Sequence, residues 1–302
     1  MSKLPLFTII IPTYNRASAV TRAIDSVLQQ TFSDFELIII DDGSTDDTKE
    51  KITAIADPRL RYIYQKNQER SAARNHGIRL AKGEYITFLD SDDEALPNWL
   101  ATFAKIVKTP KIGVACVGYT EIRQKNGQMQ NKDYFPENLG PIFENQVCLF
   151  WPAGTFAIHR RWFDIVGDYI VGMSFAENTE LAIRLVSACL KDDWQVVSVN
   201  EPMITYYKED HSGASSPKQS KVVFKSIMYI LNHHPHQLKK SPRVHGYYWA
   251  MAGVNAARLG QYATAKTCFL SAIKSDSRNV KHYGRFLLSM FPPIAKKFWG
   301  WS

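Results

Sequence analysis

The stretch EYITFLDSDDE, residues 84–94, joins two patterns of different chemistry. Its first part, EYITFL, is a run of aromatic and β-branched residues that is typical of a buried β-strand. Its second part places four carboxylates, those of Asp90, Asp92, Asp93 and Glu94, within five positions. A chain with a formal net charge of +8 therefore concentrates negative charge where a strand ends. Either a bound cation or the start of a helix would account for this arrangement.

Similar strand-like runs recur along the first 120 residues. They occupy 6–11, 35–40, 60–64 and 112–117, and amphipathic helical patterns lie between the runs at 17–30, 46–56, 71–81 and 97–108. This alternation predicts an α/β fold with a doubly wound, mostly parallel sheet that is flanked by helices. Ligands of such sheets bind beyond the carboxyl ends of the strands, so the residues that follow each strand are the first candidates for a site.

The later part of the chain changes to helical character. A strand at 154–160, a helix at 178–190 and strands at 194–199 and 203–207 are predicted before a turn-rich linker at 212–220. We therefore expect a first domain at 1–215 and a helical C-terminal region at 216–302. Residues 249–276 resemble a single tetratricopeptide helix pair, which we expect to pack as a helical cap. The 222–275 helices would offer the natural face for a homo-oligomer.

The C-terminal stretch KHYGRFLLSMFPPIAKKFWGWS, residues 281–302, mixes cationic and aromatic side chains. This composition suits either an interfacial contact with a membrane or docking on the protein's own core, and the pattern leaves both open. The Pro292–Pro293 pair predicts that no long helix runs through the segment. Any insertion into a bilayer would therefore be shallow.

Composition excludes several functional classes. No basic run with interleaved aromatic residues is present, so we expect no nucleic-acid binding. The four scattered cysteines (Cys116, Cys148, Cys189 and Cys268) lack metal-binding spacing and are expected to be buried free thiols. No apolar run approaches the roughly 18 residues that a membrane span needs, and residues 1–16 lack the layout of a signal peptide. The expected location is cytoplasmic, with peripheral contact at the inner face of the membrane.

The position of Pro97 helps to separate the two explanations for the carboxylates. A helix capped by Ser91 would place Pro97 inside it, where the lost backbone hydrogen bond costs about 3 kcal/mol. Pro97 fits better as the first residue of a helix. Residues 90–94 are then a loop whose crowded carboxylates favour a shared Mg²⁺ or Mn²⁺ bound together with a diphosphate.

Other strand ends carry polar residues that suit a nucleotide. Asp41 and Asp42 stand side by side in IIIDDGSTDDT, residues 38–48. A carboxylate at Asp42 can accept the imide N–H of uracil. Arg70 and Arg74, one turn apart at the start of a predicted helix, suit a diphosphate by charge and by helix dipole, or form solvated ion pairs.

Four motifs together resemble the family-2 glycosyltransferases of GT-A fold. They are TIIIPTYNR (8–16), LIIIDDGSTDDT (37–48), ERSAARNHGI with KGEYITFLDSDDE (69–94) and AENTELAIRL (176–185), in order over about residues 6–210. The resemblance implies a GT-A, Rossmann-like sheet and an inverting transfer of a sugar from a nucleotide-sugar, usually UDP-linked, to an acceptor hydroxyl. The acceptor would be a carbohydrate or a lipid-linked glycan of a cell-surface polysaccharide or glycoconjugate.

The resemblance also implies roles for individual residues. Pro12, Tyr14 and Asp42 would hold the uridine, and Arg70 would help to bind the donor. Asp90 and Asp92 would form the DXD motif, with Asp90 toward the ribose and Asp92 on the Mn²⁺ or Mg²⁺ ion.

A histidine is nominated for the metal or diphosphate by the same resemblance. The segment YYKEDHSGASS, residues 206–216, matches the place where many members supply such a histidine. That residue would be His211.

The chain departs from the family at the expected general base. The usual Glu-Asp pair reads Glu177-Asn178 here, and an amide cannot act as a general base. Glu177 takes the role, or Asn178 positions the acceptor while another carboxylate serves, or the chain is slow or inactive. Glu180 is disfavoured because Arg184, four residues on, offers a helix-surface partner.

Two alternatives of other classes accompany the enzyme hypothesis. A nucleotide-sugar-binding protein without catalysis would account for Asn178. A scaffold that recruits partners through its helical region would account for the tetratricopeptide-like pair.

Overall fold

A computed structural model describes residues 4–125, 128–208 and 216–299. The strands are β1 Phe7–Thr13, β2 Phe35–Asp41, β3 Leu60–Tyr64, β4 Tyr85–Phe88, β5 Glu94–Ala95, β6 Ile112–Lys125, β7 Gln128–Tyr134, β8 Glu137–Asn138, β9 Val147–Cys148, β10 Phe156–His159 and β11 Gln195–Lys208. The helices are α1 Val20–Leu28, α2 Thr48–Thr53, α3 Glu69–Leu80, α4 Trp99–Ile106, the 3₁₀ turn η1 Pro141–Phe143, α5 Arg161–Val166, α6 Glu177–Lys191, α7 Pro217–His233, α8 Pro235–Lys239, α9 Pro242–Arg258, α10 Tyr262–Ser275, α11 Val280–Ser289 and α12 Pro292–Trp299.

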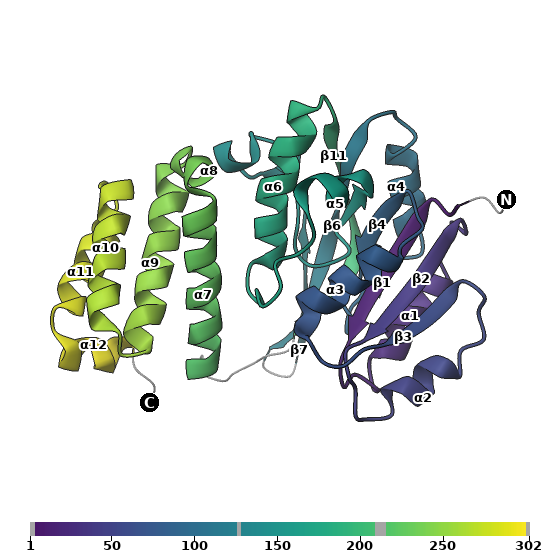
Figure 1. Ribbon diagram of the computed structural model, residues 1–302, viewed down its shortest axis with the longest axis horizontal. Coiled ribbons are helices and arrows are strands. Elements are labelled where there is room, and N and C mark those ends of the chain that lie inside the picture. The colour runs from purple at the N-terminus through teal and green to yellow at the C-terminus, as the bar shows by residue number, and fades with distance from the viewer. Residues whose placement is uncertain (1–3, 126–127, 209–215, 300–302) are drawn as a thin grey trace. The chain divides into compact units, whose positions relative to one another are not determined.

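The main sheet is mixed but mostly parallel, as the alternating pattern predicts (Figure 1). Its strand order is β3-β2-β1-β4-β10-β6-β11-β5, and β7 pairs with β6. β3, β2, β1 and β4 are parallel, whereas β10 is inserted antiparallel between β4 and β6. The two strands expected at 194–199 and 203–207 are one continuous strand, β11, with irregularities in its register beside β6.

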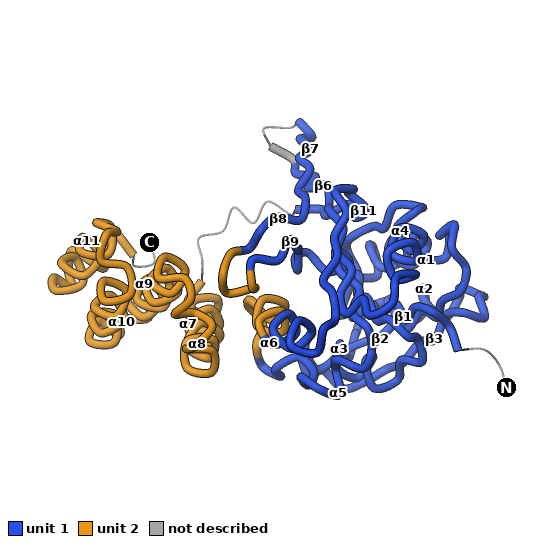
Figure 2. Tube along the Cα trace, turned by 90° about the horizontal axis from the view of Figure 1, so that it is seen from above, with its two compact units in different colours: residues 1–139, 145–172, 184–210 blue, residues 140–144, 173–183, 211–302 orange. Residues whose placement is uncertain are grey.

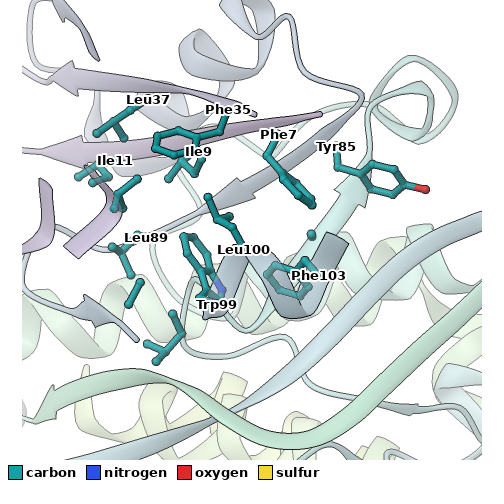
Figure 3. Close-up of a cluster of buried hydrophobic side chains, with 14 of the residues drawn as sticks. Phe7, Ile9, Ile11, Phe35, Leu37, Tyr85, Leu89, Trp99, Leu100 and Phe103 are labelled. Atoms are coloured by element: carbon teal, nitrogen blue, oxygen red, sulfur yellow. The ribbon is translucent and has the colours of Figure 1, made fainter. Parts of the chain in front are cut away.

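Both faces of β1 are covered, which explains its uninterrupted apolar sequence. Ile9 and Ile11 belong to a buried cluster that also contains Trp99, Leu100 and Phe103, the last three from α4 (Figure 3). Ile10 points to the other face, where α3 lies so close that a Cβ at Gly77 would be 2.5 Å from Ile10 Cγ2. Trp99 Nε1 also donates a hydrogen bond of 2.8 Å to Gly154 O.

The chain divides into two compact units (Figure 2). Unit 1 holds residues 1–139, 145–172 and 184–210, and unit 2 holds residues 140–144, 173–183 and 211–302. The first part of α6, up to Ile183, belongs to unit 2 together with the helices α7–α12. Within unit 2, the predicted helix pair is α9 and α10, and Gly253 of α9 lies against the ring of Phe269 in α10.

Local details of the sequence-based prediction need one correction. The helix expected to begin at Pro97 begins at Trp99, and residues 94–95 form the short strand β5 against β11. Pro97 still lies before the first helical residue, in agreement with its lack of an N–H.

The four cysteines are buried and free, as expected. Among the described residues, no helix is long and apolar enough to cross a membrane.

The close contact of α3 with β1 can be tested by comparing the stability of two glycine-to-alanine variants. Alanine favours a helix over glycine by about 1 kcal/mol, so Gly284→Ala, in α11 with open space around the site, should stabilise the protein by up to about that amount. Gly77→Ala should instead destabilise it by about 1–2 kcal/mol, because its methyl group would overpack the buried Ile10. Urea denaturation of both variants measures the difference, and equal stabilisation by both would contradict the close approach of α3 to β1.

Candidate active site

Hydrogen bonds connect the loops that follow β1 and β2 at the carboxyl edge of the sheet. Asn15, which has a φ of 50°, donates its backbone N–H to Ser44 Oγ at 2.9 Å. Its side-chain Oδ1 accepts the backbone N–H of Thr45 at 2.8 Å, and Arg16 N donates to Thr48 Oγ1 at 3.0 Å. Asn tolerates the left-handed conformation that this reciprocal arrangement requires. The two loops therefore form one ordered edge.

The neighbouring aspartates at the end of β2 have different partners. Asp41 is fully buried and accepts hydrogen bonds from Ser44 N and from the hydroxyl of Tyr62. Asp42 accepts from Gln65 Nε2 at 2.7 Å and from Gln68 N at 2.9 Å, both through Oδ1. Asp41 thus stabilises the turn, and Asp42 is held in place by the segment between β3 and α3.

The other two residues nominated for the uridine lie at the end of β1. Pro12 is buried within the strand, opposite Ile40 of β2, and Tyr14 is 48% exposed beyond it. Tyr14 is therefore an accessible aromatic group at this edge, and Pro12 contributes mainly to the sheet.

Arg74, Arg16 and Tyr207 contact the four carboxylates of the stretch 90–94. Asp90 Oδ1 lies 2.8 Å from Arg74 Nη2, and Asp92 Oδ2 lies 3.0 Å from Arg16 Nη2. Asp93 Oδ1 accepts from Tyr207 N at 3.2 Å, and Glu94 Oε2 accepts from Tyr207 OH at 3.0 Å. Asp90 and Asp92 thus bind cationic side chains of unit 1, and the next two residues hold the loop to β11.

The environment of Asp93 is the most unusual of the four. The residue is 1% exposed, and its Oδ2 has no hydrogen-bond partner among the described residues. Burial, together with the charges of Asp90 and Asp92, raises the pKa of the Asp93 carboxyl to about 9. The Asp93 carboxyl therefore keeps its proton at neutral pH and adds no negative charge to the loop.

Arginine side chains of unit 1 surround this loop. Arg74 of α3 is 1% exposed and lies over the ring of Tyr169. Arg22 of α1 donates to Asp92 O at 2.6 Å and stacks on Tyr207 at 4.0 Å from the ring centre. Arg70, the arginine nominated from the sequence, lies exposed in the first turn of α3. Arg74, one turn further on, is the arginine that contacts Asp90. In the sequence, the only signal for Arg74 was its position four residues after Arg70.

The nominated base and its neighbour begin α6. Glu177 is 8% exposed and Asn178 is 7% exposed, and they follow Ala176, whose φ is 57°. A non-glycine residue at positive φ stores backbone strain, which often accompanies functional sites. The Oδ1 atom of Asn178 has no hydrogen-bond partner among the described residues. A buried acceptor of this kind is suited to receive a hydrogen bond from a ligand.

The expectation that Glu180 lies on the surface of its helix is wrong. Glu180 is 1% exposed and its Oε1 lies 2.9 Å from His234 Nε2, within unit 2. Arg184 donates to the backbone carbonyls of residues 166–168. A tertiary partner more than fifty residues away therefore contacts the buried carboxylate of Glu180.

Two observations bear on a metal site. His211 lies outside the described residues. Within 4–125, 128–208 and 216–299, no group of three or more His, Cys, Asp and Glu side chains is arranged to hold a metal ion by itself.

Comparisons with known proteins agree with this architecture. Residues 8–170 match the sequence profile of glycosyl transferase family 2. A putative colanic acid biosynthesis glycosyl transferase of Escherichia coli K12, WcaA, is 47% identical over 106 residues, which is 34% of this chain and 38% of that protein. An uncharacterized glycosyltransferase of Rickettsia felis is 41% identical over 160 residues, which is 51% of this chain and 26% of that protein. The chain therefore spans well under half the length of these relatives.

Solved structures show the same fold. TarS of S. aureus, residues 1–349 in complex with UDP-GlcNAc, aligns with a TM-score of 0.68 at 16% identity, over 97% of this chain and 91% of that one. The mannosyltransferase PcManGT of Pyrobaculum calidifontis, in complex with GDP-Man and Mn²⁺, aligns with a TM-score of 0.58 at 15% identity, over 99% of this chain and 88% of that one. The fold is thus GT-A-like with a helical C-terminal region, and because the profile covers more than half of its residues, the chain belongs to glycosyl transferase family 2.

Proposed function

We propose that this protein transfers a sugar from a UDP-sugar to an acceptor hydroxyl, with inversion of configuration, in the synthesis of a cell-surface polysaccharide or glycoconjugate. One observation carries the proposal. Asp42 follows β2, and Asp90 and Asp92 follow β4, so all three lie at the carboxyl ends of strands that flank β1. Arg74 and Arg16 contact Asp90 and Asp92 there. Family membership, and the UDP-GlcNAc complex of the similarly folded TarS, support the same reading.

The donor would lie across the carboxyl ends of β2, β1 and β4. Asp42, held from one side by Gln65 and Gln68, would accept the N–H of the uracil, beside the exposed Tyr14. Asp90 would face the ribose. Arg70, at the exposed N-terminal turn of α3, would contact the diphosphate by charge and helix dipole.

The loop at 90–94 fits a divalent cation that is shared with the donor. Burial, and after it the charges of Asp90 and Asp92, raise the pKa of Asp93, and a bound cation would offset the repulsion between these carboxylates. Asp92, with a side chain 31% exposed, would supply the protein ligand, joined by His211. Mg²⁺ and Mn²⁺ are commonly held by one or two carboxylates plus substrate phosphates, which agrees with the lack of a complete protein cage among the described residues. Such a cation would offset the negative charge of the departing UDP.

Glu177 would act as the general base. It would take the proton of the acceptor hydroxyl as that oxygen attacks the anomeric carbon from the face opposite UDP. Asn178, whose amide cannot take a proton, would orient the same hydroxyl through its unsatisfied Oδ1. The left-handed backbone of Ala176 would set the direction in which α6 begins, and with it the positions of both side chains.

A second candidate function is donor binding without turnover, which Asn178 in place of the usual aspartate favours. It would share the donor contacts and differ only in the acceptor step. A role for unit 2 in binding a second copy of the chain is compatible with either function.

We also propose a cytoplasmic location with peripheral contact at the inner face of a membrane, made by α11 and α12. Seven large apolar side chains are exposed on these helices and the turn between them: Val280, Tyr283, Leu287, Met290, Phe291, Ile294 and Phe298. In α11, a spacing of three to four residues places Val280, Tyr283 and Leu287 along one side, with His282 and Ser289 buried on the other. In α12, Ile294 and Phe298 lie four residues apart and share one side.

Charge indicates what would cover this side. Residues 280–299 contain Lys281, Arg285, Lys296 and Lys297 but no carboxylate side chain. An apolar row flanked only by cations is complementary to anionic lipid. A lipid-linked acceptor would be reached at such a surface, and one relative 39% identical over 103 residues, from Campylobacter jejuni, is named as a glucosyltransferase of an undecaprenol-linked glycan.

The metal proposal predicts a specific loss of turnover. With a panel of UDP-sugars and Mn²⁺, wild-type protein should release UDP, and EDTA should stop the release. Asp92→Asn should lower the rate by about a hundredfold or more, because the metal loses its protein ligand. Asp193→Asn, which changes an exposed carboxylate paired with Lys111, should have no effect. UDP release that persists in EDTA and in Asp92→Asn would exclude a metal-dependent enzyme.

The base proposal predicts unequal effects at two neighbouring positions. Glu177→Gln should slow transfer by about a hundredfold or more, as expected for loss of a general base. Asn178→Asp should change the rate by less than about tenfold, and Glu50→Gln on the exposed side of α2 should change nothing. A large gain with Asn178→Asp would instead mean that the family's base is missing, and metal-dependent UDP binding without turnover would favour the binding protein.

The membrane proposal predicts lipid selectivity. Vesicles that contain phosphatidylglycerol should float the protein in a density gradient, whereas phosphatidylcholine vesicles should not. Leu287→Ser with Phe298→Ser should weaken flotation by about tenfold or more, because two apolar anchors are lost. Val171→Ser, at an exposed valine of unit 1, is the matched control. Equal binding to both lipids, or dimerisation without lipid that the double variant abolishes, would contradict the proposal.

A further inference from the structure

An exposed tryptophan stands on a cluster of tyrosines in unit 1. Trp151 is 48% exposed, and its ring meets Tyr206 edge to face at 4.8 Å and Tyr119 at 5.6 Å between ring centres. Tyr119 in turn stacks on Tyr134 at 4.7 Å. We call these four residues the aromatic cluster. Tyr119 and Tyr206 pack against the indole and limit its movement. The part of the indole that they do not cover faces solvent.

The aromatic cluster lies at the same edge of the sheet as the carboxylates. β10 runs antiparallel to β4, so the residues that precede β10, Trp151 among them, lie beyond the carboxyl end of β4. Gly154, three residues on, is so near this end that a Cβ there would be 3.3 Å from Phe88 O.

β11 brings Tyr206 of the cluster to the carboxylate loop. Tyr206 precedes Tyr207, whose N–H is bonded to Asp93 Oδ1. Burial and then the charges of Asp93 and Asp92 raise the pKa of Tyr206 to about 12, which agrees with this placement. Tyr206 therefore lies close to the carboxylate loop and also contacts the exposed indole.

Sheet order separates this surface from the proposed nucleotide site. β3, β2 and β1, which carry the residues proposed to bind uridine, lie on one side of β4. β10, β6 and β11, which carry or adjoin the aromatic cluster, lie on the other side. The carboxylate loop begins after β4 and ends in β5, which pairs with β11, so it runs from the first set of strands past the second. A sugar attached to the diphosphate would therefore have the nucleotide on one side and the aromatic cluster on the other.

We propose that Trp151 is the stacking surface for a pyranose ring of the acceptor, and this inference rests on the proposed glycosyltransferase function. A pyranose with equatorial hydroxyl groups presents axial C–H groups on one face, and such a face packs on an aromatic ring. Stacking of flat rings on aromatic side chains tolerates different hydroxyl patterns, so Trp151 would position the acceptor and leave its identity to other contacts.

Other large aromatic residues near this edge have structural contacts. Trp162 and Trp99 are fully buried. Tyr207 donates its hydroxyl to Glu94 and lies beneath Arg22. Trp151, in contrast, is 48% exposed although it is large and apolar.

The test uses saturation-transfer NMR of the full chain with a panel of methyl pyranosides, in the presence of UDP and Mn²⁺. Wild-type protein should transfer saturation to the ring C–H protons of at least one glycoside. Trp151→Ala should weaken the apparent affinity by about tenfold, the scale of one stacking contact. Trp151→Phe, which keeps an aromatic face, should retain most of the binding, and Tyr247→Ala, at an aromatic residue of α9 that is 56% exposed, should retain all of it.

Failure of the inference can be told apart from failure of the proposed function. Calorimetric titration of wild-type protein with UDP and Mn²⁺ tests the function, and no binding there would overturn both. If UDP binds, the inference is overturned when no glycoside receives saturation, or when a glycoside binds equally to wild type and Trp151→Ala. It is also overturned if Trp151→Phe loses as much affinity as Trp151→Ala, because ring stacking would then not be the contact. Thermal unfolding of each variant checks that the fold is retained.

Discussion

The buried guanidinium of Arg74 is the interaction on which the carboxyl edge of the sheet depends. A cation that is 1% exposed is costly unless an anion accompanies it, and Asp90 supplies that anion at 2.8 Å. Arg74 belongs to α3, and Asp90 follows β4, so the pair fixes a helix to a strand end. The same helix lies against β1 at Gly77. One side chain thus sets the relation between two neighbouring strands and the loop beyond them.

With Asp90 directed toward α3, the remaining carboxylates of the loop take separate directions. Asp92 reaches Arg16 in the loop after β1, whereas Asp93 and Glu94 bind β11 on the other side of the sheet. A loop of five residues therefore joins the proposed nucleotide half to the proposed acceptor half. Crowded carboxylates repel one another, and a cation bound together with a diphosphate would reduce that repulsion.

Much of this arrangement could be predicted from the sequence. Apolar runs such as FELIII mark strands because both faces of a central parallel strand are buried, and the polar residues after them mark the site. The choice between Arg70 and Arg74 could not be predicted, since both lie on one face of α3 and only packing buries the second. The surface position expected for Glu180 is wrong for a related reason, because His234 offers a buried partner that no local pattern reveals.

The sequence by itself determined the strand–helix order, the family and the positions of the candidate carboxylates, because these depend on periodicity and on short motifs whose chemistry is local. Tertiary structure alone decided which arginine meets Asp90, that Asp93 is buried, and that Trp151 is exposed beside Tyr206 while Trp162 is not. These properties depend on residues distant in the chain that packing brings together. A side chain's partner and its dielectric surroundings exist only once the strands have paired.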